Sequence, residues 1–137
     1  MKALVPFALL VALTAAACGD KSSVSTTTPT TTQTTETFSG TVAVKGSNAH
    51  NFSVSAPGTV IVTLTVASPP ATVVMGVGIG TPTGSTCALL TGASVDTAAG
   101  TTAQLSGVVT AGALCVQVYD VGNQTSPVSY TVTVVHP

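Results

Sequence analysis

The sequence predicts an all-β protein, and three observations support this. From residue 38 onward apolar side chains recur at every second position, turn-forming residues separate the alternating stretches, and no window shows the 3.6-residue period of an amphipathic helix. About a hundred residues suffice for one hydrophobic core. We therefore expect residues 38–137 to form a single antiparallel β-sandwich with a jelly-roll-like arrangement.

Six stretches alternate clearly enough to be read as strands. The residues expected to share one face in each are Phe38, Gly40, Val42 and Val44; Phe52 and Val54; Val60, Val62, Leu64 and Val66; Val73, Met75, Val77 and Ile79; Leu114, Val116 and Val118; and Val128, Tyr130, Val132 and Val134. Turn signals such as Pro57-Gly58 and Ala111-Gly112 separate them. Residues 88–106 are rich in Gly, Ala and Thr, and we expect one or two weaker strands there.

The first 17 residues have the pattern of an export signal. Lys2 is followed by fifteen uncharged residues that end on three alanines, directly before Cys18. A helix of that length is about 22 Å long, which is shorter than the roughly 30 Å hydrocarbon core of a membrane. We expect residues 1–17 to be a signal peptide. Residues 18–37 contain little that could be buried and nine threonines after residue 25, so we expect a disordered tether there.

This layout resembles that of bacterial lipoproteins, whose cysteine at the cleavage site receives the lipid. The resemblance implies that Cys18 is lipidated and that the protein is anchored to a membrane of the cell envelope, at the outer membrane or the cell surface. Lipoprotein signals usually carry Leu three positions before the cysteine, where this chain has Ala15. The alanine run also fits ordinary secretion, so a secreted protein is the alternative.

The three cysteines support lipidation and predict a disulfide. An odd number of cysteines in an exported protein leaves one thiol without a partner unless it has another use. If Cys18 carries lipid, Cys87 and Cys115 form an even pair, and a disulfide is their expected state in an oxidising compartment. A metal site would need two further ligands, and His50 and His136 do not have the spacing of a zinc finger.

Charge restricts the classes of partner. The chain has three basic residues and four acidic ones, and Lys45 is the only basic residue after the tether. Nucleic-acid binding requires clustered Lys and Arg. We therefore expect no nucleic-acid partner, and we expect no cofactor.

The sequence contains no convincing catalytic motif, and we expect a protein that is not an enzyme. The series Gly76-x-Gly78-x-Gly80 lacks both the spacing and the following helix of a dinucleotide site, so we expect its glycines to admit a close neighbour. No serine lies in a G-x-S-x-G context. We expect His50 at an exposed strand start and His136 in a frayed terminus.

Three neighbouring residues are the candidate ligand-binding positions. Tyr119 has an aromatic ring that could stack on a sugar, and Asp120 and Asn123 follow it in an expected hairpin loop. Calcium takes six to eight oxygen ligands, usually with several carboxylates, so Asp120 and Asn123 make a weak site even together with Asp96. Asp and Asn also form turns without any ligand.

The last third of the chain resembles the bacterial pre-peptidase C-terminal domain, a β-sandwich appended to secreted proteases. Residues 110–120 read TAGALCVQVYD and residues 128–134 read VSYTVTV, where members of the family read "aGtYyvrVyd" and "ysYtltv". Two features depart from the family: residues 72–80 lack its acidic residue, and Leu114 and Cys115 replace its usual aromatic. Signal and tether account for the preceding residues, so we expect no accessory role beside a protease.

These observations together predict a non-enzymatic envelope lipoprotein. Its β-sandwich would have a structural or protein-interaction role, with an unidentified envelope protein or glycan as partner. The alternative is a carbohydrate-binding module at the cell surface. We expect the position of Tyr119 to distinguish them, because a sugar platform needs an exposed ring and a structural module would bury it.

Overall fold

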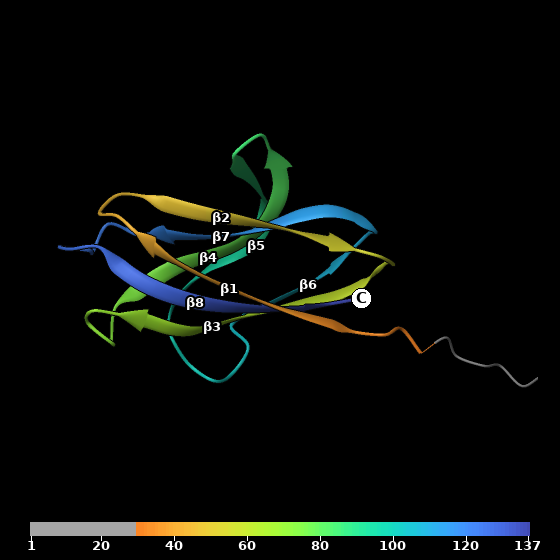
Figure 1. Cartoon of the computed structure of the whole chain (residues 1–137), viewed down its shortest axis with the longest axis horizontal. Coiled ribbons are helices and arrows are strands. Elements are labelled where there is room, and N and C mark those ends of the chain that lie inside the picture. The colour runs from red at the N-terminus through yellow and green to blue at the C-terminus, as the bar shows by residue number, and fades with distance from the viewer. Residues whose placement is uncertain (1–29) are drawn as a thin grey trace, which may run out of the picture.

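The computed structural model describes residues 30–137, so the expected signal peptide, Cys18 and residues 18–29 of the expected tether lie outside the described residues. Within residues 30–137 there are eight strands and no helix, and accordingly no helix that could span a membrane. The strands form two four-stranded antiparallel sheets packed face to face (Figure 1). The expected β-sandwich is confirmed.

The strands follow one another with short connections. Their bounds are β1 Thr34–Val42, β2 Ser47–Val54, β3 Gly58–Ser68, β4 Val74–Thr83, β5 Thr86–Ala98, β6 Leu105–Val109, β7 Gly112–Asp120 and β8 Val128–His136. One sheet has the order β1-β8-β3-β6, and the other has the order β2-β7-β4-β5.

This strand order is that of a jelly roll. The first strand pairs with the last, the second with the seventh, the third with the sixth and the fourth with the fifth, all antiparallel. The pairing is that of one long hairpin whose strand pairs are divided between the two sheets. Pairing of β3 with β8 completes the first sheet, and pairing of β4 with β7 completes the second. The expected jelly-roll-like arrangement is confirmed.

The core lies between the two sheets and follows the predicted alternation. Most of the residues expected on the inner faces are buried, and Leu64, Met75 and Tyr130 are among the largest of them. Two expected core positions are wrong. Val44 lies in the turn after β1 and is 40% exposed. Val66 is 48% exposed because a register shift between Leu64 and Val66 turns Ala67 inward instead.

Strand β1 begins four residues earlier than the expected tether boundary. Thr34 is paired with His136, and the pairing continues to Val42 opposite Val128. Threonine has a high β-propensity, and an edge strand needs to bury only one face. The composition of this threonine-rich segment fits either a loop or a strand. Pairing with β8 makes it a strand here.

The two ends of the sandwich differ in what they carry. The chain enters β1 at the end where β8 finishes, since Thr34 lies opposite His136. The opposite end carries the connections 43–46, 69–73 and 121–127. We call this the distal end, and Figure 1 shows it on the left, away from the point where the chain enters β1.

Candidate functional site

The carboxylate of Asp120 organises the distal loops. Its Oδ1 accepts hydrogen bonds from the backbone N–H groups of Gly122, Asn123 and Gln124 at 2.8, 3.2 and 3.3 Å. Its Oδ2 accepts one from the backbone N–H of Lys45 at 2.7 Å. Residues 121–127 and the turn after β1 are thus held together by a single side chain.

The electrostatics of Asp120 agree with this structural role. The hydrogen bond from the Lys45 backbone, followed by those from the β7–β8 loop, lowers the pKa of Asp120 below its ordinary value. The carboxylate is therefore ionised at neutral pH and is used by four backbone donors. Asp120, a candidate ligand-binding residue, holds the loop that presents Asn123 through these hydrogen bonds.

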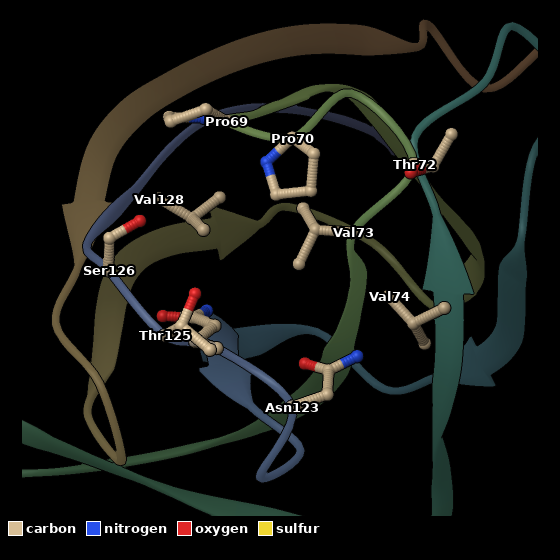
Figure 2. Close-up of a pocket in the computed structure, with 10 residues that line it drawn as sticks. Pro69, Pro70, Thr72, Val73, Val74, Asn123, Thr125, Ser126 and Val128 are labelled. Atoms are coloured by element: carbon tan, nitrogen blue, oxygen red, sulfur yellow. The ribbon is translucent and has the colours of Figure 1, made fainter.

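A pocket of about 260 Å³ opens at the distal end, between the β3–β4 connection and the β7–β8 loop (Figure 2). Asn123, one of the candidate residues, lines it, whereas Tyr119 does not. The neighbouring Gln124 also lines the pocket and is only 7% exposed. Its Nε2 lies 3.0 Å from the sulfur of Met75, and its Oε1 is buried with no hydrogen-bond partner among the described residues.

The sequence pattern did not distinguish Gln124 from an ordinary loop residue. Glutamine between Asn123 and Thr125 reads as a solvated position, because neighbouring polar residues usually mark exposed turns. The burial comes from the loop's path: Asp120 holds the Gln124 backbone N–H, and the side chain turns inward to Met75 on β4.

Tyr119 lies on the outer face of its sheet, opposite the core face of β7. Its ring occupies the space where a Cβ on Gly76 would be, and its side chain is half-buried. The ring is thus neither enclosed in the core nor free of the sheet. An aromatic side chain laid across a cross-strand glycine covers backbone that the glycine leaves open.

The three glycines of β4 face outward and accept neighbouring groups, as expected. Tyr119 covers Gly76, the side chain of Leu89 covers Gly78, and the backbone of residue 88 covers Gly80. The beginning of β5 therefore folds over the outer face of β4, and Figure 1 shows the β4–β5 hairpin rising out of the sheet. A side chain larger than hydrogen at any of these three glycine positions would prevent this approach.

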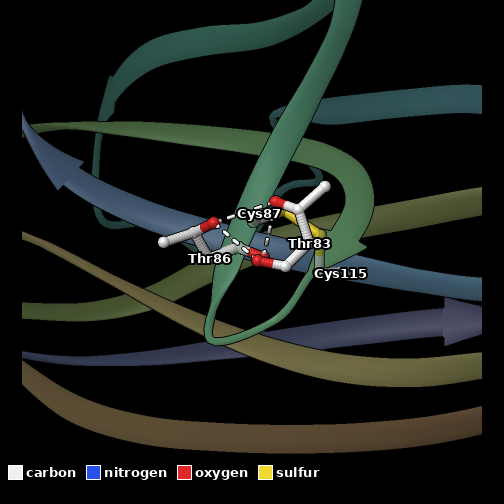
Figure 3. The surroundings of a disulfide bond; sticks show 4 residues. All are labelled: Thr83, Thr86, Cys87 and Cys115. Atoms are coloured by element: carbon white, nitrogen blue, oxygen red, sulfur yellow. Dashed lines mark hydrogen bonds between the residues drawn. A yellow bond between two sulfur atoms is a disulfide. The ribbon is translucent and has the colours of Figure 1, made fainter.

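The predicted disulfide between Cys87 and Cys115 is confirmed, with Cα atoms 5.9 Å apart (Figure 3). Cys115 is fully buried and Cys87 is 8% exposed. The bond joins the start of β5 to the outer face of β7. Thr83 and Thr86 close the adjacent turn through hydroxyl groups 2.8 Å apart. Among residues 30–137 no three His, Cys, Asp or Glu side chains are grouped as a metal ion would require.

The expected exposure of His136 is wrong. The residue is 3% exposed, its ring packs against Phe52 with centroids 5.2 Å apart, and its Nε2 lies 2.9 Å from Oε1 of Glu36. Pairing of β8 with the early part of β1 brings Glu36 and His136 together. The two residues are 100 positions apart in the sequence, so no local pattern predicts this contact.

The expected position of His50 at an exposed strand start is also wrong. His50 stacks on Phe38 with centroids 4.9 Å apart and an interplanar angle of 10°. Its Nε2 lies 2.7 Å from the hydroxyl of Tyr130. Burial lowers the pKa of His50 and raises the pKa of Tyr130 to about 12, so both groups are neutral near pH 7. This cluster joins the edge strands β1 and β2 of the two sheets.

We expect the neutral state of His50 to make folding stability depend on pH. A base whose pKa is lower in the folded state stabilises the fold fully above its ordinary pKa near 6.5 and loses that contribution as the pH falls through the folded value. The free energy of unfolding should therefore decline on acidification below pH 6.5. His50→Gln keeps an acceptor for Tyr130 without titrating, and urea unfolding across this range should show a shallower decline. An identical decline in the variant would contradict the assignment.

No protein-family model matches this chain, and no curated protein matches it either. The relation to the pre-peptidase C-terminal domain therefore stays a prediction from the residues of the last third of the chain.

Proposed function

We propose that the protein is a non-enzymatic lipoprotein of the cell envelope that displays its β-sandwich away from the membrane. The arrangement of the two ends supports this most directly. The chain that would lead from the anchor enters at Thr34, beside the end of β8, while the distal loops lie at the opposite end. A domain tethered in this way presents its distal loops to partners. Its role would be structural or protein-interacting.

The hydrogen bonds of three titratable side chains also support a non-enzymatic role. His50 contacts the Tyr130 hydroxyl, His136 contacts Glu36, and Asp120 accepts from backbone N–H groups. Each of these contacts holds two strands or loops together. A general acid or base must lie within hydrogen-bond reach of the substrate proton that it transfers, and these three groups use their hydrogen bonds within the fold.

A carbohydrate-binding role is the second candidate, and the distal pocket favours it. The pocket is lined by residues without charge, which suits a neutral ligand. Tyr119 gives less support, because its ring is half-buried across Gly76 and lies outside the pocket.

Replacing the proposed lipidation site tests the anchor. We expect the wild-type protein in the membrane fraction with acyl mass on its N-terminal cysteine, and Cys18→Ser in the soluble fraction, since a lipid chain supplies the membrane affinity. A variant carrying both Cys87→Ser and Cys115→Ser keeps Cys18 and should stay in the membrane fraction. Wild-type protein without acyl mass by mass spectrometry, or Cys18→Ser protein that stays membrane-bound, would overturn the proposal.

A further inference from the structure

The distal pocket has the size of a site for one ring. Ligand pockets for drug-sized molecules span roughly 300–1,000 Å³. The distal pocket, at about 260 Å³, is slightly smaller. A single six-membered ring with its substituents, such as one residue of a longer chain, is therefore the largest group that it would enclose.

The walls of the pocket combine apolar and neutral polar groups. Pro69 and Pro70 form one side, as Figure 2 shows, and Val73 and Val128 add further apolar surface. Asn123 and two hydroxyl-bearing neighbours in the β7–β8 loop supply hydrogen-bonding groups on the other side. None of the lining residues carries a charge. An ion would find no counter-charge here, whereas a neutral molecule with an apolar face and polar edges fits both walls.

Gln124, which lines the pocket, has a buried acceptor that lacks a donor. The residue is more than nine-tenths buried, it lines the pocket, and its Oε1 has no partner among the described residues. A buried acceptor without a hydrogen bond destabilises the fold, because it has lost water without gaining a replacement. A rotation of the Gln124 amide toward the pocket would let a ligand O–H group donate to this oxygen, and binding would then remove that cost.

We propose that the distal pocket binds one neutral sugar residue, with the Gln124 amide turning so that its Oε1 accepts a hydrogen bond from a sugar hydroxyl, and with the C–H face of the ring against Pro69 and Pro70. Sugars combine O–H donors with apolar C–H faces and carry no charge, which matches the three properties of the pocket. This proposal rests on the proposed function, since a displayed module would carry its ligand site at the end farthest from the anchor.

The test is a titration of the full-length, ¹⁵N-labelled protein with methyl β-glucoside and with N-acetylglucosamine. Micelles of a phosphocholine detergent avoid sugar headgroups that would compete. With so few contacts we expect a dissociation constant of about 1–10 mM, so the titration extends to about 100 mM. Saturable shifts of the backbone and side-chain amides of Asn123 and Gln124 are the expected result for at least one of the two sugars.

Two glutamine variants make the test specific. Gln124→Met removes the acceptor, keeps the length of the side chain and preserves contact with Met75. We expect at least tenfold weaker sugar binding and a melting temperature that is unchanged or higher. Gln117→Met is the matched control, because Gln117 lies on the outer face of the sheet beside Tyr119 and outside the pocket. It should bind sugar as the wild type does.

Three results would overturn the proposal: no saturable shift with either sugar, shifts centred on Tyr119 that Gln117→Met abolishes, or wild-type affinity in Gln124→Met. The same preparation reports on the anchor through the mass of its N-terminal cysteine. Acylated protein without sugar binding would refute the pocket and leave the proposed function intact. Sugar binding by protein without acyl mass would refute the anchor alone.

Discussion

Removing the disulfide with the double substitution Cys87→Ala and Cys115→Ala is expected to lower the free energy of unfolding by about 3–4 kcal/mol. The bond closes a loop with a sequence separation of 28, and this loop restricts the unfolded chain. Both cysteines are also buried, so packing adds to the loss. Urea unfolding followed by circular dichroism measures the change as a lower midpoint.

The loss should appear first in the β4–β5 hairpin. Apart from its pairing with β4, the start of β5 is held to the sheet by Cys87, and residues 88–92 are exposed. We expect faster hydrogen exchange there than in the wild type, with little change in β3 and β8, whose inner faces form the core. Unchanged unfolding free energy, or free thiols from both residues in unfolded, unreduced wild-type protein, would contradict the assignment.

The substitution Gly80→Ala is expected to lower the free energy of unfolding by about 1–3 kcal/mol, the usual range for overpacking. A Cβ at this position would meet the backbone carbonyl of Ala88, with the carbonyl carbon at 2.7 Å, and the sulfur of Cys87 at 2.9 Å. Neither a backbone group nor a disulfide sulfur can rotate away as a flexible side chain can. The hairpin must therefore shift, and thermal unfolding should show a lower midpoint.

Gly107→Ala is the matched control for this substitution. Gly107 is also a strand glycine, but a Cβ on it would meet no atom within 4 Å. We expect a change within about 0.5 kcal/mol, because an added methyl group there restricts the unfolded chain without a clash. Equal destabilisation by the two substitutions would mean that close packing over β4 is unimportant.

The two-residue period of the apolar residues was enough to predict most of the strands. Strands β3 and β8 were readable because burial of one face imposes alternation. Strand β4 is buried on both faces, and it was readable because glycines alternate with its large core residues. Strand β5 was not readable, since its first half is mostly exposed on both faces and its second half packs only partly buried side chains such as Ala93 and Val95 against the core. The outward turn of Val66 depends on a local register shift, and the pattern of apolar residues contains no sign of it.

The candidate site was predictable only in its location. Asp120 and Asn123 were recognised because Asp and Asn mark turns, and both lie at the distal end. The buried position of Gln124 and the contacts of His50 and His136 depend on segments 49 to 100 positions away in the sequence. No local pattern records which distant strand becomes a neighbour. Cysteine count, in contrast, is independent of distance, and it identified the disulfide.

The antiparallel pairing of β1 with β8 has a mechanical consequence. Pairing extends from Thr34 opposite His136 to Val42 opposite Val128, so the strand's hydrogen bonds lie across the direction in which the chain enters. A pull on the chain before Thr34, resisted by a ligand held at the distal end, would load these bonds together in shear rather than one after another. In a domain tethered as proposed, strand β1 would thus resist forced unfolding.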